Sequence, residues 1–263
     1  MENRIDRKFA ELRARGEKAF VAYISAGDPN LEATHDLALA LERSGVDILE
    51  LGIPFSDPLA DGIVNQLAAQ RALESGTTPA GVLECIRKIR QSSQIPIVLY
   101  TYMNPIFVYG FDAFHRDAEA AGVDGLLILD LPPDENGDRL TLQSSIKRIR
   151  LIAPTTPPER IQEITANADG FIYYVSREGV TGEQASVATS VPEHIAKIRA
   201  TTGLPIAIGF GVSNPEQARE VAGYGDAVVV GSAIVRRIAE NATSPDVAAK
   251  VGEFVAPLVS AIK

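Results

Sequence analysis

The chain has 263 residues, of which 46% are hydrophobic and 22% charged, so it is long enough to bury a large core. The formal charge of −9 argues against a nucleic-acid-binding groove, and the sequence holds no apolar run of about 18 residues that could span a membrane. A single cysteine, Cys85, excludes a disulfide framework, and the charged N-terminus is unlike a secretory signal. We therefore expect a cytoplasmic protein.

Short β-rich runs alternate with amphipathic helical runs eight times along the chain. The predicted strands are 20–25, 47–52, 97–102, 125–130, 148–152, 170–175, 205–209 and 227–231. Eight such units without a composition break predict a single (βα)8 TIM barrel of the α/β class, one domain over residues 1–263. An open doubly wound sheet is the alternative. Similar strands and the absence of a GxGxxG motif after the first strand favour the barrel.

Additional helices are expected at three places. Residues 1–16 predict an extra N-terminal helix with Ile5, Phe9 and Leu12 on one face, which we expect to cover the bottom of the barrel. The segment after the second strand is long enough for two helices, and a further helix is expected after the eighth strand.

The stretch 47–62, DILELGIPFSDPLADG, places Glu50 inside a hydrophobic strand and Asp61 in the acidic, proline-rich loop that follows. A buried charge is costly unless it points into a polar cavity, and catalytic groups of such barrels lie at the carboxyl ends of strands. Glu50 and Asp61 are therefore acid/base candidates, with Asp61 expected on the more polar loop. The alternative is structural: Glu50 in a salt bridge and Asp61 as the N-cap of a helix beginning near Ile63.

Two loops rich in small residues, 209–214 (GFGVSN) and 231–235 (GSAIV), follow the seventh and eighth strands. Barrels bind phosphate at this position, because small residues let an anion approach backbone N–H groups at a helix N-terminus. Tight strand-to-helix turns are the alternative. The run 176–190, rich in Gly, Ser and Thr, predicts a lid that contributes Thr181 and Gly182, with a disordered connection as the alternative and Arg177 expected to be solvated.

Other polar groups narrow the chemistry. His35, His115 and His194 all fall in helical stretches, which argues against a zinc site. Lysines lie in helices or, like Lys18 and Lys147, ahead of strands, so none is placed to form a Schiff base. The prolines and apolar residues of 104–111 and 130–135 indicate either a rigid rim or a protein interface.

Five motifs then occur in order over essentially the whole chain: ELGIPFSDPLADG (50–62), APTTP (153–157), YYVSREGVTG (173–182), GFGVS (209–213) and VVGSAIV (229–235). In these the chain resembles the α subunit of tryptophan synthase. The resemblance implies cleavage of indole-3-glycerol phosphate to indole and glyceraldehyde 3-phosphate for L-tryptophan biosynthesis. It also implies no metal and no bound cofactor in this chain, and docking on a pyridoxal-phosphate β subunit in an α2β2 heterotetramer.

The resemblance also implies roles for individual residues. Glu50 would protonate indole C3 and remove the glycerol hydroxyl proton, and Asp61 would accept a hydrogen bond from the indole N–H. Tyr173 would line the site and help to position the acid. The remaining substrate-binding positions are Tyr100, Thr181, Gly182, Phe210, Gly211, Gly231 and Ser232, of which Gly182, Gly211, Gly231 and Ser232 would hold the phosphate.

Departures from the family pattern are Ile63, where proline often follows the DG pair, and Tyr100 and Leu129, where smaller or aliphatic residues are common. Three alternatives remain at this stage. One is a free-standing indole-producing lyase. Another is a sugar-phosphate isomerase or an indole-glycerol-phosphate synthase, although the synthase should show a strand-end lysine. The last is a non-catalytic regulatory subunit that binds phosphate ligands.

Overall fold

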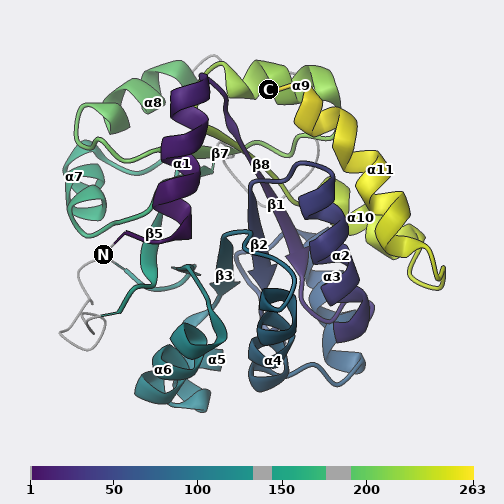
Figure 1. The fold of residues 1–263 in the computed structure, drawn as a ribbon. Coiled ribbons are helices and arrows are strands. Elements are labelled where there is room, and N and C mark those ends of the chain that lie inside the picture. Colours follow the sequence, from purple (N-terminus) through teal and green to yellow (C-terminus); the bar gives the residue numbers. More distant parts are fainter. Residues whose placement is uncertain (1, 133–143, 176–190) are drawn as a thin grey trace.

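Eight parallel strands close into a barrel in which each strand pairs with the next along the chain (Figure 1). The computed structural model describes residues 2–132, 144–175 and 191–263. The strands are β1 (Ala19–Ser25), β2 (Ile48–Gly52), β3 (Ile97–Thr101), β4 (Gly125–Ile128), β5 (Lys147–Ile152), β6 (Ile172–Val175), β7 (Ile206–Gly209) and β8 (Ala227–Val230). Each overlaps its predicted counterpart.

Pairing between the first and last strands closes the sheet. Val21 of β1 lies opposite Ile48 of β2, and on its other side β1 pairs with β8, with Ala19 opposite Ala227. The predicted TIM barrel is therefore confirmed, and the open sheet is excluded.

The helices of the described chain surround this barrel. They are α1 (Arg4–Arg15), α2 (Leu31–Arg43), α3 (Ile63–Glu74), α4 (Pro79–Arg90), α5 (Met103–Tyr109), α6 (Phe111–Ala121), α7 (Pro158–Ala166), α8 (Val191–Arg199), α9 (Pro215–Ala222), α10 (Ser232–Glu240) and α11 (Val247–Ser260). Two helices follow β2 and two follow β8, as expected, and α11 packs against α2 (Figure 1). The predicted rim 104–111 is largely helical, because α5 covers most of it.

Local sequence explains where several helices begin. Asn3 and Asp6 form a capping box at α1, in which Asn3 accepts from the Ile5 N–H and Asp6 accepts from the Asn3 N–H. Asn30, Thr78 and Asn214 likewise cap α2, α4 and α9 with their side chains. The segment 27–30 therefore ends in the N-cap of α2.

The core has two layers that follow the alternation of side chains along each strand. Leu49 and Leu51 pack in the outer layer, between the barrel and the helices. Ile48 packs in the inner layer, where Ile5, Phe9 and Leu12 of α1 close the bottom of the barrel as expected. Since side chains alternate between faces, Glu50 points into the barrel interior above Ile48.

Within the described residues, no helix combines the length and apolar content needed to cross a membrane.

Candidate active site

A cavity of about 140 Å³ lies at the carboxyl ends of the strands. Its walls come from distant parts of the chain: Tyr23, Asn65, Tyr100, Tyr173, Val175, Gly209, Gly211, Val229, Gly231 and Ser232. Barrel closure thus brings together five of the residues expected at the site: Tyr100, Tyr173, Gly211, Gly231 and Ser232.

Glycines make room for the tyrosines that line this cavity. A Cβ atom built on Gly52 would lie 2.5 Å from the Tyr23 hydroxyl oxygen, and one on Gly209 would lie 2.9 Å from that of Tyr173. A side chain at either position would push the ring aside, so glycine lets the two rings lean over the strands.

Glu50 lies fully buried inside the barrel, with an exposed fraction of 0%. Neither carboxyl oxygen has a hydrogen-bond partner among residues 2–132, 144–175 and 191–263, so within that part of the chain the salt-bridge alternative is wrong. Burial without such partners disfavours the charged form and raises the pKa of Glu50 to about 8. This carboxyl is therefore protonated near neutral pH.

Asp61 is also buried, with an exposed fraction of 6%, but three side chains donate hydrogen bonds to it. The hydroxyl of Tyr102 lies 2.8 Å from Oδ2, and the Tyr100 hydroxyl and Asn65 Nδ2 lie 3.2 and 3.3 Å from Oδ1. Burial is the larger effect and raises the pKa of Asp61 above its ordinary value, although the hydrogen bonds from Tyr102, Asn65 and Tyr100 act to lower it. The polar surroundings expected for Asp61 are therefore the hydrogen-bond donors of Tyr102, Tyr100 and Asn65.

The alternative role of Asp61 as a helix cap is wrong. Gly62 occupies the N-cap position of α3, and no side chain of the described residues caps that helix. The Asp61 side chain points instead to Tyr100 of β3, to Tyr102 just after that strand, and to Asn65 of α3.

Both acids lie near the rings that line the cavity. Burial first, and then the charges of Glu50 and Asp61, raise the pKa of the Tyr173 phenol well above its ordinary value. The same two charges act on Tyr23, which lies directly opposite Glu50 in the β1–β2 pairing. The site therefore combines a protonated acid, a hydrogen-bonded carboxylate and neutral phenols.

Sequence reasoning missed three residues of this arrangement: Tyr23, Asn65 and Tyr102. Asn65 follows Asp61 by four residues at a helix start, a spacing that could have indicated the contact. Tyr23 could have been found from its inward position in the alternating first strand. The bond from Tyr102 to Asp61 joins residues 41 apart in the chain and carries no local signal.

The predicted phosphate loops have features suited to an anion. Gly231 is the N-cap of α10 and Ser232 its first residue, and no side chain of the described residues caps this helix. Its first backbone N–H groups are thus free to face a ligand. Gly211 lines the same cavity and has a φ of 74°, a left-handed conformation that favours glycine.

Of the described residues expected at the site, Glu50, Asp61 and Phe210 are not among those that line the cavity. The Phe210 side chain is 2% exposed and packs in the outer core, so only its backbone could face a ligand. Thr181 and Gly182, together with Arg177 and the expected lid over 176–190, lie outside the described residues.

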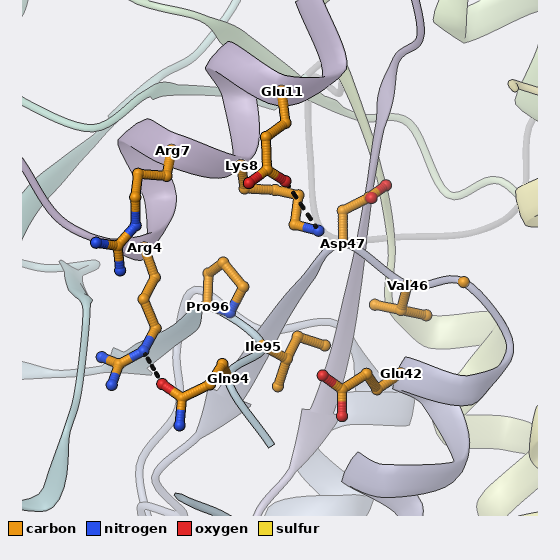
Figure 2. A pocket seen from close by; sticks show the side chains of 11 residues that line it. Arg4, Arg7, Lys8, Glu11, Glu42, Val46, Asp47, Gln94, Ile95 and Pro96 are labelled. Carbon is orange, nitrogen blue, oxygen red and sulfur yellow. Dashed lines mark hydrogen bonds and ion pairs between the residues drawn. The ribbon is translucent and has the colours of Figure 1, made fainter. Parts of the chain in front are cut away.

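A larger cavity, of about 410 Å³, lies at the opposite end of the barrel beneath α1 (Figure 2). Several of its charged side chains have polar partners, some of them outside the cavity wall. Arg4 binds Gln94 at 2.8 Å and Asp124 at 3.0 Å, Lys8 lies 3.8 Å from Glu11, and Asp47 lies 2.6 Å from Lys263. These pairs tie α1 and the C-terminus to the bottom of the barrel, so we assign this cavity a structural role.

The histidines, Lys147 and Cys85 lie in the elements to which the sequence assigned them or at their start. The three histidines lie in α2, α6 and α8, and in the described part of the chain no group of three or more His, Cys, Asp or Glu residues could hold a metal ion. Lys147 pairs with Asp6 of α1 at 2.7 Å, at the bottom of the barrel. Cys85 is buried in α4 as a core thiol.

Comparison with known proteins identifies close relatives over the full length. The family model of the tryptophan synthase alpha chain matches residues 9–262. Alpha chains from Opitutus terrae and Geotalea daltonii are 52% and 46% identical, the first alignment covering 99% and the second 98% of both sequences.

Solved structures similar to this chain come from the same family. The tryptophan synthase subunit alpha of Legionella pneumophila is 38% identical, with a TM-score of 0.88, and the match covers 100% of this chain and 99% of that one. A chain of Mycobacterium tuberculosis tryptophan synthase is 33% identical, with a TM-score of 0.90 and the same coverage.

Proposed function

The chain belongs to the tryptophan synthase alpha chain family, and we propose that Glu50 and Asp61 carry out the reaction of that family in this protein. The alpha subunit cleaves indole-3-glycerol phosphate in tryptophan biosynthesis, as an indole-3-glycerol phosphate lyase. The observation that carries the assignment is the buried, unpartnered Glu50 carboxyl inside the barrel, next to a hydrogen-bonded Asp61. The whole chain, residues 1–263, acts in this proposal as one barrel domain.

Glu50 begins the reaction in its protonated form. Its proton passes to C3 of the indole ring, which makes the ring an electron-accepting indolenine cation. The Glu50 carboxylate formed in this step then takes the proton of the glycerol hydroxyl next to the ring. The bond between C3 and the side chain breaks, its electron pair returns to the ring, and indole and glyceraldehyde 3-phosphate result. A pKa of about 8 suits a group that must donate and then accept a proton near neutral pH.

Asp61 stabilises the cation formed in the first step. A carboxylate has about four acceptor positions, so three donors leave room for the indole N–H. The negative charge of Asp61 then lies close to the positive charge that develops on the ring. Two buried acids thus take different roles because, within the described chain, only Asp61 has hydrogen-bond donors.

The phosphate of the substrate binds, in this proposal, at Gly211, Gly231 and Ser232, where the loop after β7 meets the start of α10. Thr181 and Gly182 are proposed to add contacts, as in the sequence-based expectation. Indole is itself an electron-rich enamine, so protonation of C3 supplies the electron sink that other aldolases obtain from a lysine imine or a metal. We therefore propose that this chain works without a cofactor of its own.

An alpha chain has a beta subunit as its partner, and we propose that the two assemble as α2β2, with pyridoxal phosphate in the beta subunit, in the cytoplasm. Exposed apolar side chains support a docking surface at the active-site end of the barrel. Leu59 and Ile63 are 76% and 64% exposed, and Phe107 and Val108 of α5 are 73% and 77% exposed. A patch of this kind is typical of a protein interface. Ile63, which departs from the family pattern, forms part of it.

The test is indole release from indole-3-glycerol phosphate, measured with and without a beta subunit, for the native chain and for Glu50→Gln. We expect the native chain to release indole, faster with the partner, and the variant to lose about 10³-fold in kcat while still binding glycerol phosphate. A variant that keeps most of its rate would refute the role of Glu50. A rate that does not respond to any beta subunit would indicate a free-standing lyase.

A further inference from the structure

We propose that Tyr100 is a positioning residue for Asp61: its hydroxyl fixes the carboxylate in the orientation that receives the indole N–H. This inference rests on the proposed function, because it assigns to Tyr100 an effect on a catalytic group.

Packing contacts hold the Tyr100 ring in place independently of its hydrogen bond to Asp61. Tyr100 lies directly opposite Gly52 in the β2–β3 pairing. Its ring meets that of Tyr23 edge to face, with centroids 4.9 Å apart, and packs on a small cluster formed by Tyr23, Ala68 and Val235. With the ring held in this way, the hydroxyl has a defined position.

That hydroxyl completes the set of donors around Asp61. Tyr102 holds Oδ2 at 2.8 Å and itself accepts a hydrogen bond from the Ala60 N–H at 3.0 Å. Oδ1 is held by Asn65 at 3.3 Å and by Tyr100 at 3.2 Å. Without Tyr100, the only donor of the described chain to Oδ1 would be an amide at the longest of the three distances. The carboxylate would then be free to turn about its last torsion.

The ionisable groups around this carboxylate come from several strands: Glu50 on β2, Tyr23 on β1, Tyr173 on β6, and Tyr100 with Tyr102 at β3. The pKa values of the four phenols are raised above the ordinary value, chiefly by burial, so these groups remain neutral donors over the working range. Asp61 and Glu50 are therefore the groups in this cluster expected to titrate in a pH profile of activity.

The experiment compares Tyr100→Phe and Tyr100→Leu with the native chain in profiles of kcat and kcat/KM against pH. Phe keeps the ring and removes the hydroxyl, whereas Leu removes both. Loss of a donor to a carboxylate raises its pKa, and Asp61 must be ionised to act. In both variants we therefore expect the acidic limb of kcat/KM to move upward by about half to one pH unit and kcat to fall roughly three- to tenfold. The basic limb, set by Glu50, should stay in place.

Tyr109→Phe is the matched control. Tyr109 also donates to an aspartate, Asp117, at 2.9 Å, but this pair joins α5 and α6 outside the barrel. The control should leave both limbs and kcat unchanged.

Two results separate this inference from the proposed function. If Glu50→Gln is inactive but neither Tyr100 variant moves the acidic limb, Tyr100 only fills space and the inference is wrong. If Glu50→Gln retains its rate, the proposed function itself fails. A thermal-unfolding midpoint that falls in the Tyr100 variants without any movement of the limb would also count as a structural role and overturn the inference.

Discussion

Tyr23 and Glu50 lie directly opposite each other in the β1–β2 pairing, with both side chains inside the barrel. The Tyr23 ring leans over Gly52, two residues beyond Glu50 on the same face of the strand. The acid lies buried beside this ring, and its burial keeps it protonated near neutral pH.

Asp61→Asn should lower kcat/KM roughly 100-fold, because an amide cannot balance the positive charge on the ring. The matched control is Asp57→Asn, on the same loop but with an exposed side chain. Steady-state kinetics of the isolated chain measure both. A loss confined to phosphate affinity, with kcat unchanged, would contradict the role given to Asp61.

The raised pKa of Glu50 predicts a pH dependence of stability. The folded protein holds this proton up to about pH 8, whereas the unfolded chain releases it near the ordinary value of 4.5. The contribution of Glu50 to stability is therefore present below about pH 4.5 and is lost as the pH rises to about 8. Glu50→Gln, which cannot ionise, should become more stable relative to the native chain across this window.

The difference in free energy of unfolding between Glu50→Gln and the native chain is measured by denaturant unfolding at about five pH values between pH 5 and pH 9. It should grow until about pH 8 and then level off. A difference that stays constant with pH would mean that Glu50 is ionised in the folded protein.

Gly52→Ala should destabilise the fold by about 1–3 kcal/mol, because the new methyl group meets the Tyr23 hydroxyl. It should also lower kcat/KM, since the displaced ring lines the cavity at the candidate active site. Tyr23→Phe removes the atom of closest contact, so the double variant should recover part of the lost stability. Thermal unfolding of the single and double variants checks this, and equal stability in the two would argue against the contact.

Phe107→Ser should weaken binding to a beta subunit about tenfold or more, because it removes an exposed aromatic side chain from the proposed docking surface. Indole release by the isolated chain should not change. Leu73→Ser is the control, because Leu73 lies at the end of α3 away from Ile63 and the proposed docking surface. This variant should bind the beta subunit as the native chain does. Titration calorimetry measures the binding of both variants to the beta subunit. An unchanged Kd for Phe107→Ser would show that Phe107 is not part of the interface.

Much of the fold could be read from the sequence because its signals are local. Eight buried runs separated by capped helices predict the barrel, and the alternation around Glu50 already places it on the inner face. That Gly211, Gly231 and Ser232 line one cavity was also predictable, since they lie just after the ends of two neighbouring strands.

The surroundings of Asp61 were not predictable. A buried aspartate and an aspartate that caps a helix can have the same local sequence. The sequence also did not show whether the Phe210 side chain lines the site or packs in the core. Its side chain turned outward because Gly209 and Gly211, on either side of it, face the cavity.

The sequence by itself therefore determined the number and order of the strands, the inward position of Glu50 and the family of the protein. Only the tertiary structure decided the state of the two acids. Tyr100 and Tyr102 are 39 and 41 residues from Asp61 along the chain, and closure of the barrel brings their hydroxyls to its carboxylate. Glu50 is left without such donors in the described chain, so burial acts on it alone. Burial and hydrogen bonding depend on which distant residues meet, and together they set which acid keeps its proton.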